Sequence, residues 1–175
     1  MSITLVLGGA ASGKSKYAES LCASPRAYVA TAQGFDDEMR SKVSKHQRQR
    51  GADWITVEQP LDLVRALIEA ESKASTILVD CLTLWLTNLV MHERDAAAEV
   101  SMLLEQLMVM KAKVVIVSNE LGLGVVPEHG LTRRFRELHG VMNQRMAEVA
   151  DTVVFVVAGL PQVLKGSRPE PLPPA

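Results

Sequence analysis

A glycine-rich stretch near the amino terminus constrains the fold of this chain more than any other feature. Residues 8–15 read GGAASGKS and match the pattern Gly-x-x-x-x-Gly-Lys-Ser of a phosphate-binding loop (P-loop). A β-branched run, residues 3–7, precedes the loop, and a helical pattern follows it. Because a P-loop needs a strand before it and a helix after it, the sequence predicts a nucleotide-binding α/β domain.

The residue types in this loop indicate what each position contributes. Backbone N–H groups of the loop and the first turn of the following helix are suited to face phosphate oxygens. Lys14 is a predicted catalytic residue that reaches the outer phosphates, and the Ser15 hydroxyl is suited to ligate Mg²⁺. We therefore expect nucleotide binding by Gly8, Gly9, Ala10, Ala11, Ser12, Gly13, Lys14 and Ser15.

Short apolar runs alternate with helical segments along the whole chain. The runs read ITLVLG, RAYVAT, WITVE, STILVD, KVVIVSNE and DTVVFVVAG. Continuous apolar runs of this kind indicate strands that are buried on both faces. Apolar residues recur at helical spacing most clearly over residues 14–22, 36–48, 61–72, 96–110 and 132–150. The pattern predicts an α/β, P-loop NTPase-like three-layer fold with a mostly parallel central sheet.

The composition excludes several classes of protein. The 175 residues are 47% hydrophobic and 22% charged, with a formal net charge of -1, which fits neither a basic nucleic-acid binder nor a disordered chain. We expect one domain over residues 1–165 and a flexible, proline-rich tail over residues 166–175. No apolar run approaches the roughly 18 residues that span a bilayer. Cys22 and Cys81 form no metal-binding pair, so we expect reduced thiols and a cytoplasmic location.

An acidic residue ends one of the predicted strands. Asp80 closes STILVD, and a carboxylate at the end of a strand that neighbours the P-loop strand is suited to the magnesium shell. Capping of the following helix by Asp80 is an open alternative. The NKxD motif with which regulatory GTPases recognise guanine is absent, so small kinases and related phosphotransferases become the leading class.

A lone histidine stands among cations in KVSKHQRQR, residues 42–50. Lys42 and His46 are four residues apart and share one face of the predicted helix. Nearby cations disfavour protonation of the imidazole, which keeps it nucleophilic for attack on the α-phosphate of a nucleotide. A solvent-exposed histidine on a charged helix explains the same residues, and sequence alone favours that simpler interpretation.

Seven motifs, in order along the chain, resemble one known family. They read GGAASGKS, VATAQGFDDEM, KHQRQRGADWITVE, VDCLTLWLTN, SNELGLGVVPE, RRFRELHGVMNQRMAEVAD and AGLPQVLK. They are similar to the bifunctional adenosylcobinamide kinase / adenosylcobinamide-phosphate guanylyltransferase family of cobalamin biosynthesis. The similarity covers nearly the whole chain, to about Lys165. The resemblance implies that ATP or GTP phosphorylates adenosylcobinamide, and that GTP then guanylylates a histidine, which passes GMP to the corrinoid phosphate to give adenosylcobinamide-GDP.

The resemblance also implies roles for individual residues. The position that matches the guanylylated histidine is His46. Glu58 would accept hydrogen bonds from guanine, although sequence alone favours a solvent-exposed glutamate there. A homo-oligomer, commonly a trimer in this family, is implied as well. Beyond the P-loop, the matching nucleotide-binding positions are Thr31, Ala32, Gln33, Gln47, Arg48, Gln49, Arg50, Glu58 and Asp80.

Two other functions remain open at this stage. A single-function small-molecule kinase would use His46 only to contact phosphate, and a nucleotide-binding regulatory module would carry out no transfer chemistry. Asn119 and Glu120 follow a predicted strand at the rim where a corrinoid is expected to dock, without an assigned role. The remaining histidines are expected to be structural or surface residues; they are His92, His129 and His139.

Overall fold

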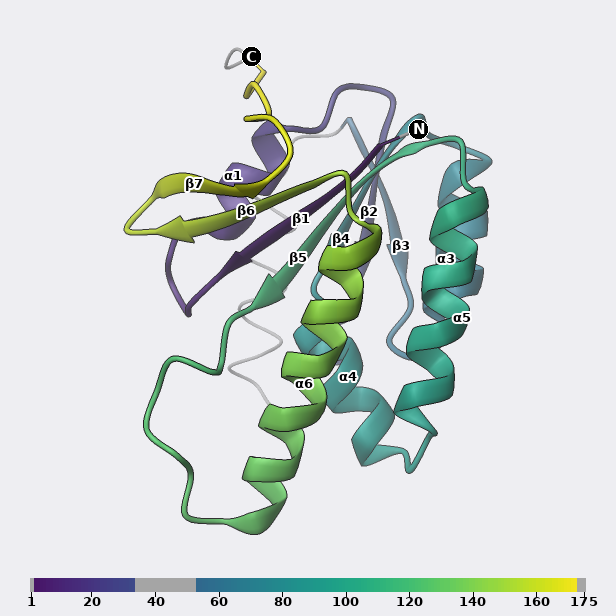
Figure 1. Ribbon diagram of the computed structural model, residues 1–175. Coiled ribbons are helices and arrows are strands. Elements are labelled where there is room, and N and C mark those ends of the chain that lie inside the picture. Colours follow the sequence, from purple (N-terminus) through teal and green to yellow (C-terminus); the bar gives the residue numbers. More distant parts are fainter. Residues whose placement is uncertain (1, 34–52, 173–175) are drawn as a thin grey trace.

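A single mixed sheet forms the centre of the molecule. The computed structural model describes residues 2–33 and 53–172. Within them, seven strands lie in the order β3-β2-β4-β5-β1-β6-β7 (Figure 1). All neighbouring pairs are parallel except β6 and β7. The strands are β1 (Ser2–Gly8), β2 (Arg26–Ala30), β3 (Trp54–Glu58), β4 (Thr76–Asp80), β5 (Lys113–Asn119), β6 (Thr152–Val157) and β7 (Leu160–Lys165).

Helices cover both faces of this sheet and make the fold three-layered. The described helices are α1 (Lys14–Ser20), α3 (Leu63–Glu71), α4 (Leu82–Met91), α5 (Ala96–Val109) and α6 (Gly130–Val149). Tyr17 and Ala18 of α1 pack on one face with Val6 and Val117, whereas α3, α4, α5 and α6 pack on the other (Figure 1). None of the described helices combines the length and the apolar character that crossing a membrane requires.

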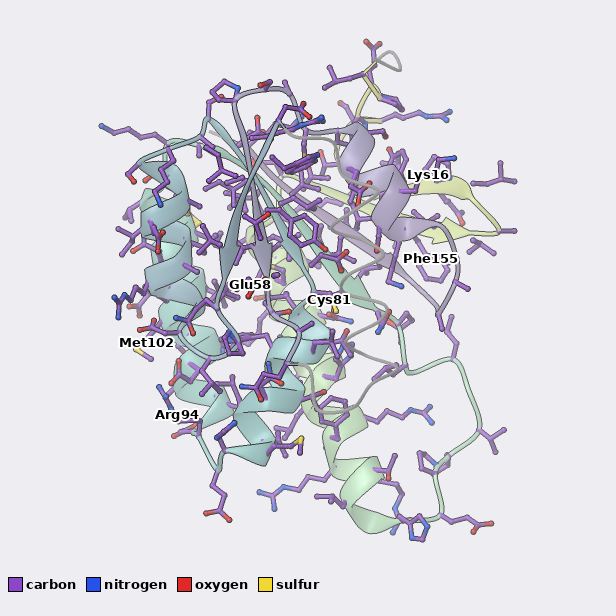
Figure 2. All side chains as sticks on the ribbon, turned by 180° about the vertical axis from the view of Figure 1, so that it is seen from behind. Lys16, Glu58, Cys81, Arg94, Met102 and Phe155 are labelled. Atoms are coloured by element: carbon purple, nitrogen blue, oxygen red, sulfur yellow. The ribbon has the colours of Figure 1, made fainter. Side chains whose placement is uncertain are left out.

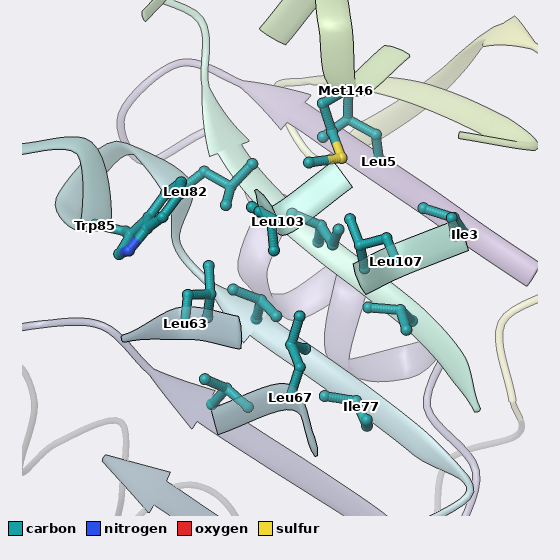
Figure 3. Close-up of a cluster of buried hydrophobic side chains, with 14 of the residues drawn as sticks. Ile3, Leu5, Leu63, Leu67, Ile77, Leu82, Trp85, Leu103, Leu107 and Met146 are labelled. Atoms are coloured by element: carbon teal, nitrogen blue, oxygen red, sulfur yellow. The ribbon is translucent and has the colours of Figure 1, made fainter. Parts of the chain in front are cut away.

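The larger core lies between the sheet and the helices α3 to α6. Ile3 and Leu5 of β1 meet Leu67 of α3 and Leu103 of α5 in one continuous apolar cluster (Figure 3). Trp85 of α4 is fully buried there, and its indole N–H donates to the Leu61 carbonyl at 2.8 Å. The single polar atom of the largest core side chain is therefore satisfied inside the protein.

The structure confirms most of the elements expected from sequence. All six apolar runs are strands, and helices occupy four of the five expected segments; the fifth, residues 36–48, lies outside the described residues. Sequence analysis missed α4 and β7. Helix α4 is buried on most sides, and its sequence is correspondingly apolar on nearly every side. It therefore lacks the amphipathic period by which a helix is recognised in a sequence. Strand β7 is a sheet-edge strand, mostly exposed, with Pro161 near its start.

Two adjacent residues of α3 test how this core is packed. Leu67 is fully buried and Ile68 is 52% exposed. We expect Leu67→Ala to lower the free energy of unfolding by about 2–5 kcal/mol, because it removes buried methyl groups and leaves a cavity. Ile68→Ala should change it by no more than about 0.5 kcal/mol. Urea unfolding of both variants measures the difference, and equal losses would contradict this packing.

Candidate nucleotide-binding site

The P-loop is held in a compact turn between β1 and α1. The Ser12 N–H donates to the Gly9 carbonyl at 3.3 Å, and the ammonium group of Lys14 donates to the same carbonyl at 3.1 Å. The Gly159 N–H, from the turn between β6 and β7, donates to the Ser12 carbonyl at 2.8 Å. The loop conformation is therefore fixed by neighbouring backbone, and Lys14 is folded back over the loop.

Two glycines in the loop are required by close contacts. A Cβ atom on Gly8 would lie 2.7 Å from the Val156 carbonyl oxygen, a distance at which the backbone of β6 would have to move. Gly13 has a φ of 91° and lies against Gly159, whose Cα would be 3.2 Å from an added Cβ. The pattern of the P-loop is thus explained by conformation and by space.

The carboxyl ends of the parallel strands meet at the edge of the sheet where the P-loop begins. Gly8 is in register with Asn119 of β5, and Ala30 of β2 is in register with both Glu58 and Asp80. Since neighbouring strands are about 4.8 Å apart, Glu58 and Asp80 lie about 10 Å apart across β2. Figure 2 shows Glu58 and Cys81 at this end of the sheet. Three predicted site regions are therefore brought together.

Asp80 faces the α1 side of the sheet. Leu78, two residues earlier in β4, packs on that side, and the Tyr28 hydroxyl donates to the Asp80 carboxylate at 3.1 Å. Cys81, rather than Asp80, is the N-cap of α4, and among the described residues no side chain makes a capping hydrogen bond there. The expectation that Asp80 ends a strand next to the P-loop strand is wrong, because β5 lies between β4 and β1.

The pKa of the Cys81 thiol depends on its burial and on two nearby charges. Burial raises the pKa of its thiol to about 11, and the negative charge of Asp80 adds to this increase. The positive charge of Lys14 acts on the same thiol in the opposite direction. Asp80 and Lys14 therefore both lie close enough to Cys81 to influence it, one from β4 and the other from the P-loop.

Thr31 fixes the backbone immediately after Asp80. Its buried hydroxyl accepts from the Cys81 N–H at 2.9 Å and donates to the Cys81 carbonyl at 2.8 Å. The Asn88 amide of α4 donates to the Thr31 carbonyl at 2.7 Å. The hydroxyl of Thr31 thus holds the peptide groups of Cys81, and its backbone carbonyl binds α4. The half-buried Ala32 and Gln33 follow at the same edge.

The residues expected to serve the transfer of GMP lie outside the described residues. They are His46, Gln47, Arg48, Gln49 and Arg50. The described chain before them ends at Gln33, which follows β2 at the carboxyl edge of the sheet. Glu58, the expected guanine contact, ends β3 at the same edge and is exposed. Ser15 lies in the first turn of α1.

Sequence analysis missed a set of buried polar side chains behind this edge. The Thr83 hydroxyl lies 2.9 Å from His139 Nε2, and the Ser118 hydroxyl donates to the side-chain amide oxygen (Oδ1) of Asn143 at 2.7 Å. All four side chains are nearly inaccessible to solvent. We call Thr83, Ser118, His139 and Asn143 the α6 polar network. Its sequence signal was the spacing of His139 and Asn143, four residues apart on one helix face.

The sequence of this chain is similar to one enzyme family and to two characterised bifunctional proteins. The sequence profile of the cobinamide kinase / cobinamide phosphate guanyltransferase family matches residues 4–164. The bifunctional adenosylcobalamin biosynthesis protein CobP of Pseudomonas aeruginosa is 45% identical over 173 residues, covering 96% of this chain and 98% of that protein. The bifunctional adenosylcobalamin biosynthesis protein CobU of Salmonella typhimurium is 38% identical over 173 residues, covering 89% and 96%.

Solved structures show the same fold at low sequence identity. The flagellar accessory protein FlaH from Methanocaldococcus jannaschii has a TM-score of 0.52 and 13% identity, over 94% of this chain and 78% of its own. A KaiC-like protein from Pyrococcus horikoshii has a TM-score of 0.53 and 14% identity, over 88% and 70%. This similarity confirms the expected P-loop NTPase-like sheet and carries no information about substrate.

A matched pair of glycines tests the loop geometry. Gly13→Ala should destabilise the folded protein by at least about 1–2 kcal/mol, because a left-handed backbone disfavours a Cβ atom. Gly9→Ala should cost less than about 0.5 kcal/mol, since nothing lies within 4 Å of the added atom. Urea unfolding without nucleotide compares the two, and similar values would contradict the loop conformation.

Thiol alkylation at pH 8 tests the burial of the site. With thiol pKa values of about 11 for Cys81 and about 12 for Cys22, only about one Cys81 side chain in a thousand is a thiolate at pH 8. Native protein at pH 8 should therefore resist iodoacetamide, whereas unfolded protein should be alkylated at both cysteines. Mass spectrometry measures the labelling, and rapid alkylation of Cys81 in the native protein would refute its burial.

Proposed function

Since the chain belongs to the cobinamide kinase / cobinamide phosphate guanyltransferase family, we propose that the carboxyl edge of its sheet serves both reactions and that GMP passes through His46. The enzyme is a bifunctional cobinamide kinase and cobinamide phosphate guanylyltransferase of cobalamin biosynthesis. The full-length match to bifunctional relatives carries this conclusion. Neither a single-function kinase nor a regulatory module has support among them.

The kinase reaction uses the P-loop in this proposal. Loop N–H groups and Lys14 hold the phosphates of ATP or GTP, and Lys14 stabilises the charge of the transferred phosphoryl group. The substrate hydroxyl of adenosylcobinamide attacks the γ-phosphate, an O–P bond forms, and ADP or GDP leaves. The geometry supports this because, among the described residues, Lys14 donates to a loop carbonyl, which phosphate can replace as its partner.

Mg²⁺ fits the oxygen donors at this edge. Ser15 offers a hydroxyl and Asp80 a carboxylate, and Mg²⁺ prefers a few protein oxygens together with phosphate and water. The Tyr28 hydroxyl donates to one oxygen of Asp80 and orients the carboxylate. Among the described residues, the second oxygen of Asp80 is not used in this bond and can serve a ligand. Bound Mg²⁺ would neutralise phosphate charge. Among the described residues, no three acidic, histidine or cysteine side chains are grouped so that they could hold a metal ion by themselves.

The guanylyltransferase reaction uses His46 as the nucleophile. An imidazole nitrogen attacks the α-phosphate of GTP, an N–P bond forms, and pyrophosphate leaves. The phosphate of adenosylcobinamide phosphate then attacks the same phosphorus, which releases His46 and gives adenosylcobinamide-GDP. Support comes from the KHQRQR motif, whose cations suit a triphosphate, and from Gln33, which leads from the edge of the sheet toward this segment in the chain.

Selection of guanine is assigned to Glu58 in this proposal. A carboxylate there can accept hydrogen bonds from guanine N1–H and from the exocyclic amine, a pair of donors that adenine does not present at that edge. Glu58 follows the buried Val57 and so faces the same side of the sheet as Asp80. The homotrimer implied by the resemblance and the cytoplasmic location expected from the two cysteines stay predictions.

A covalent adduct tests the proposed intermediate. After incubation with GTP and Mg²⁺, the wild-type protein should gain the mass of one GMP, and the adduct should be labile in acid and stable in base. His46→Ala should form no adduct and should keep its kinase activity. Lys14→Ala should lose both activities, because triphosphate binding is weakened. Intact-protein mass spectrometry and a phosphorylation assay measure these outcomes.

The variants also separate the two roles. His92→Ala, which changes a histidine at the end of α4, serves as the matched control and should form the adduct like the wild type. If folded His46→Ala lost kinase activity and guanylyl transfer equally, the division of labour would be wrong. Absence of any adduct on wild-type protein that binds GTP would refute the intermediate.

A further inference from the structure

Asn119 lies beside the P-loop with its side chain on the nucleotide side of the sheet. It is the last residue of β5, the strand between β4 and β1, and it is in register with Gly8. Val115 and Val117 of the same strand pack on the α1 face, so the alternation of a strand places the Asn119 carboxamide on that face too. The P-loop leads directly into α1 there.

The backbone of Asn119 is held from the opposite face. Its N–H donates to the Thr83 hydroxyl at 2.9 Å, and its carbonyl accepts from the Asn143 amide at 2.9 Å. The next N–H, that of Glu120, donates to the Gly8 carbonyl at 3.0 Å. The carboxamide of Asn119 makes no hydrogen bond to any residue in the described part of the chain. A fixed backbone thus presents a donor and an acceptor that have no hydrogen-bond partner among the described residues.

The α6 polar network sets the orientation of both groups that hold Asn119. The Thr83 oxygen accepts from the Asn119 N–H and lies 2.9 Å from His139 Nε2, and a neutral imidazole can partner the Thr83 hydroxyl in either tautomer. Burial lowers the pKa of His139 and favours that neutral form, although the charge of Glu120 acts in the other direction. Ser118 donates to the side-chain amide oxygen (Oδ1) of Asn143, which leaves the Asn143 NH₂ group pointing toward the Asn119 carbonyl.

We propose that Asn119 is a further nucleotide-site residue whose NH₂ group donates to the terminal phosphates in the P-loop, and that Thr83, His139 and Asn143 position it. This inference rests on the proposed use of the P-loop for triphosphate. A carboxamide adds two donors without a competing charge. The α6 polar network behind Asn119 holds those donors in a fixed position. Fixed donors are suited to stabilise the charge that develops on the phosphoryl oxygens during transfer.

Binding of two nucleotides that differ only in phosphates tests the role of Asn119. We use GMP and the α,β-methylene analogue of GTP, which cannot transfer GMP, and measure Kd by calorimetry with Mg²⁺. Asn119→Ala should weaken binding of the triphosphate analogue about 10- to 100-fold, the loss expected for a hydrogen bond to a charged group, with little effect on GMP. Asn119→Asp should lose more, because its carboxylate repels phosphate.

Variants of α6 test the positioning role. Asn143→Ala should reduce kinase kcat and triphosphate affinity in the same pattern as Asn119→Ala, but by less. His139→Gln, which keeps a hydrogen-bonding group near the Nε2 position, should retain more activity than His139→Leu. Met146→Ala is the control, since Met146 is fully buried on the same helix and outside the network. It should lower thermal stability and leave the ratio of the two Kd values unchanged.

The outcomes distinguish this inference from the proposed function. Asn119→Ala with unchanged kcat and unchanged triphosphate affinity would overturn it, as would an equal loss for GMP and the triphosphate analogue. Wild-type protein that bound both nucleotides equally would overturn it too. If Met146→Ala shifted the Kd ratio as Asn143→Ala does, the positioning role would be refuted. Failure of the GMP adduct on His46 would leave all these measurements interpretable, because the analogue forms no adduct.

Discussion

The position of β1 between two parallel neighbours is the constraint on which the site depends. Its residues pair with β5 from Ser2 to Gly8 and with β6 from Thr4 to Gly8, so the register of three strands is fixed together. Because the strands are parallel, they end at one edge, and the chain must leave β1 there in a turn too close to Val156 for any side chain at Gly8. The P-loop follows from this requirement as much as from its affinity for phosphate.

Neutral hydrogen-bonding groups hold the charged ones in place around this edge. Tyr28 orients Asp80, and Thr31 binds the peptide groups of Cys81 that follow it. On the other face of the sheet, Thr83 and Asn143 of the α6 polar network bind the backbone N–H and carbonyl of Asn119 at the end of β5. A buried polar group without a partner costs more than a hydrogen bond gains, so these contacts define one arrangement rather than many. Such rigidity suits a site that works by electrostatic stabilisation.

The comparisons separate fold from chemistry. FlaH and the KaiC-like protein share the sheet at 13% and 14% identity, and that likeness extends to the architecture alone. CobP and CobU are 45% and 38% identical over nearly the whole chain, and with them the family activity is shared. One edge of a parallel sheet accommodates many phosphate-dependent reactions, since the loops and strand ends carry the specific groups. In this chain those groups are spread over β2, β3, β4 and β5.

Local sequence determined the elements that depend on local pattern: six strands, four helices and the P-loop, whose glycines have a conformational cause in the loop itself. The family motifs also identified the activity. Only the tertiary structure decided the strand order, which placed β5 rather than β4 beside β1, because register between distant strands leaves no local signal. It likewise revealed α4, whose burial on all sides removes the amphipathic period, and the partners of Thr31, Asn119 and His139, which are far apart in sequence. A side chain's role in the site depends on such long-range contacts, and residue type alone does not encode them.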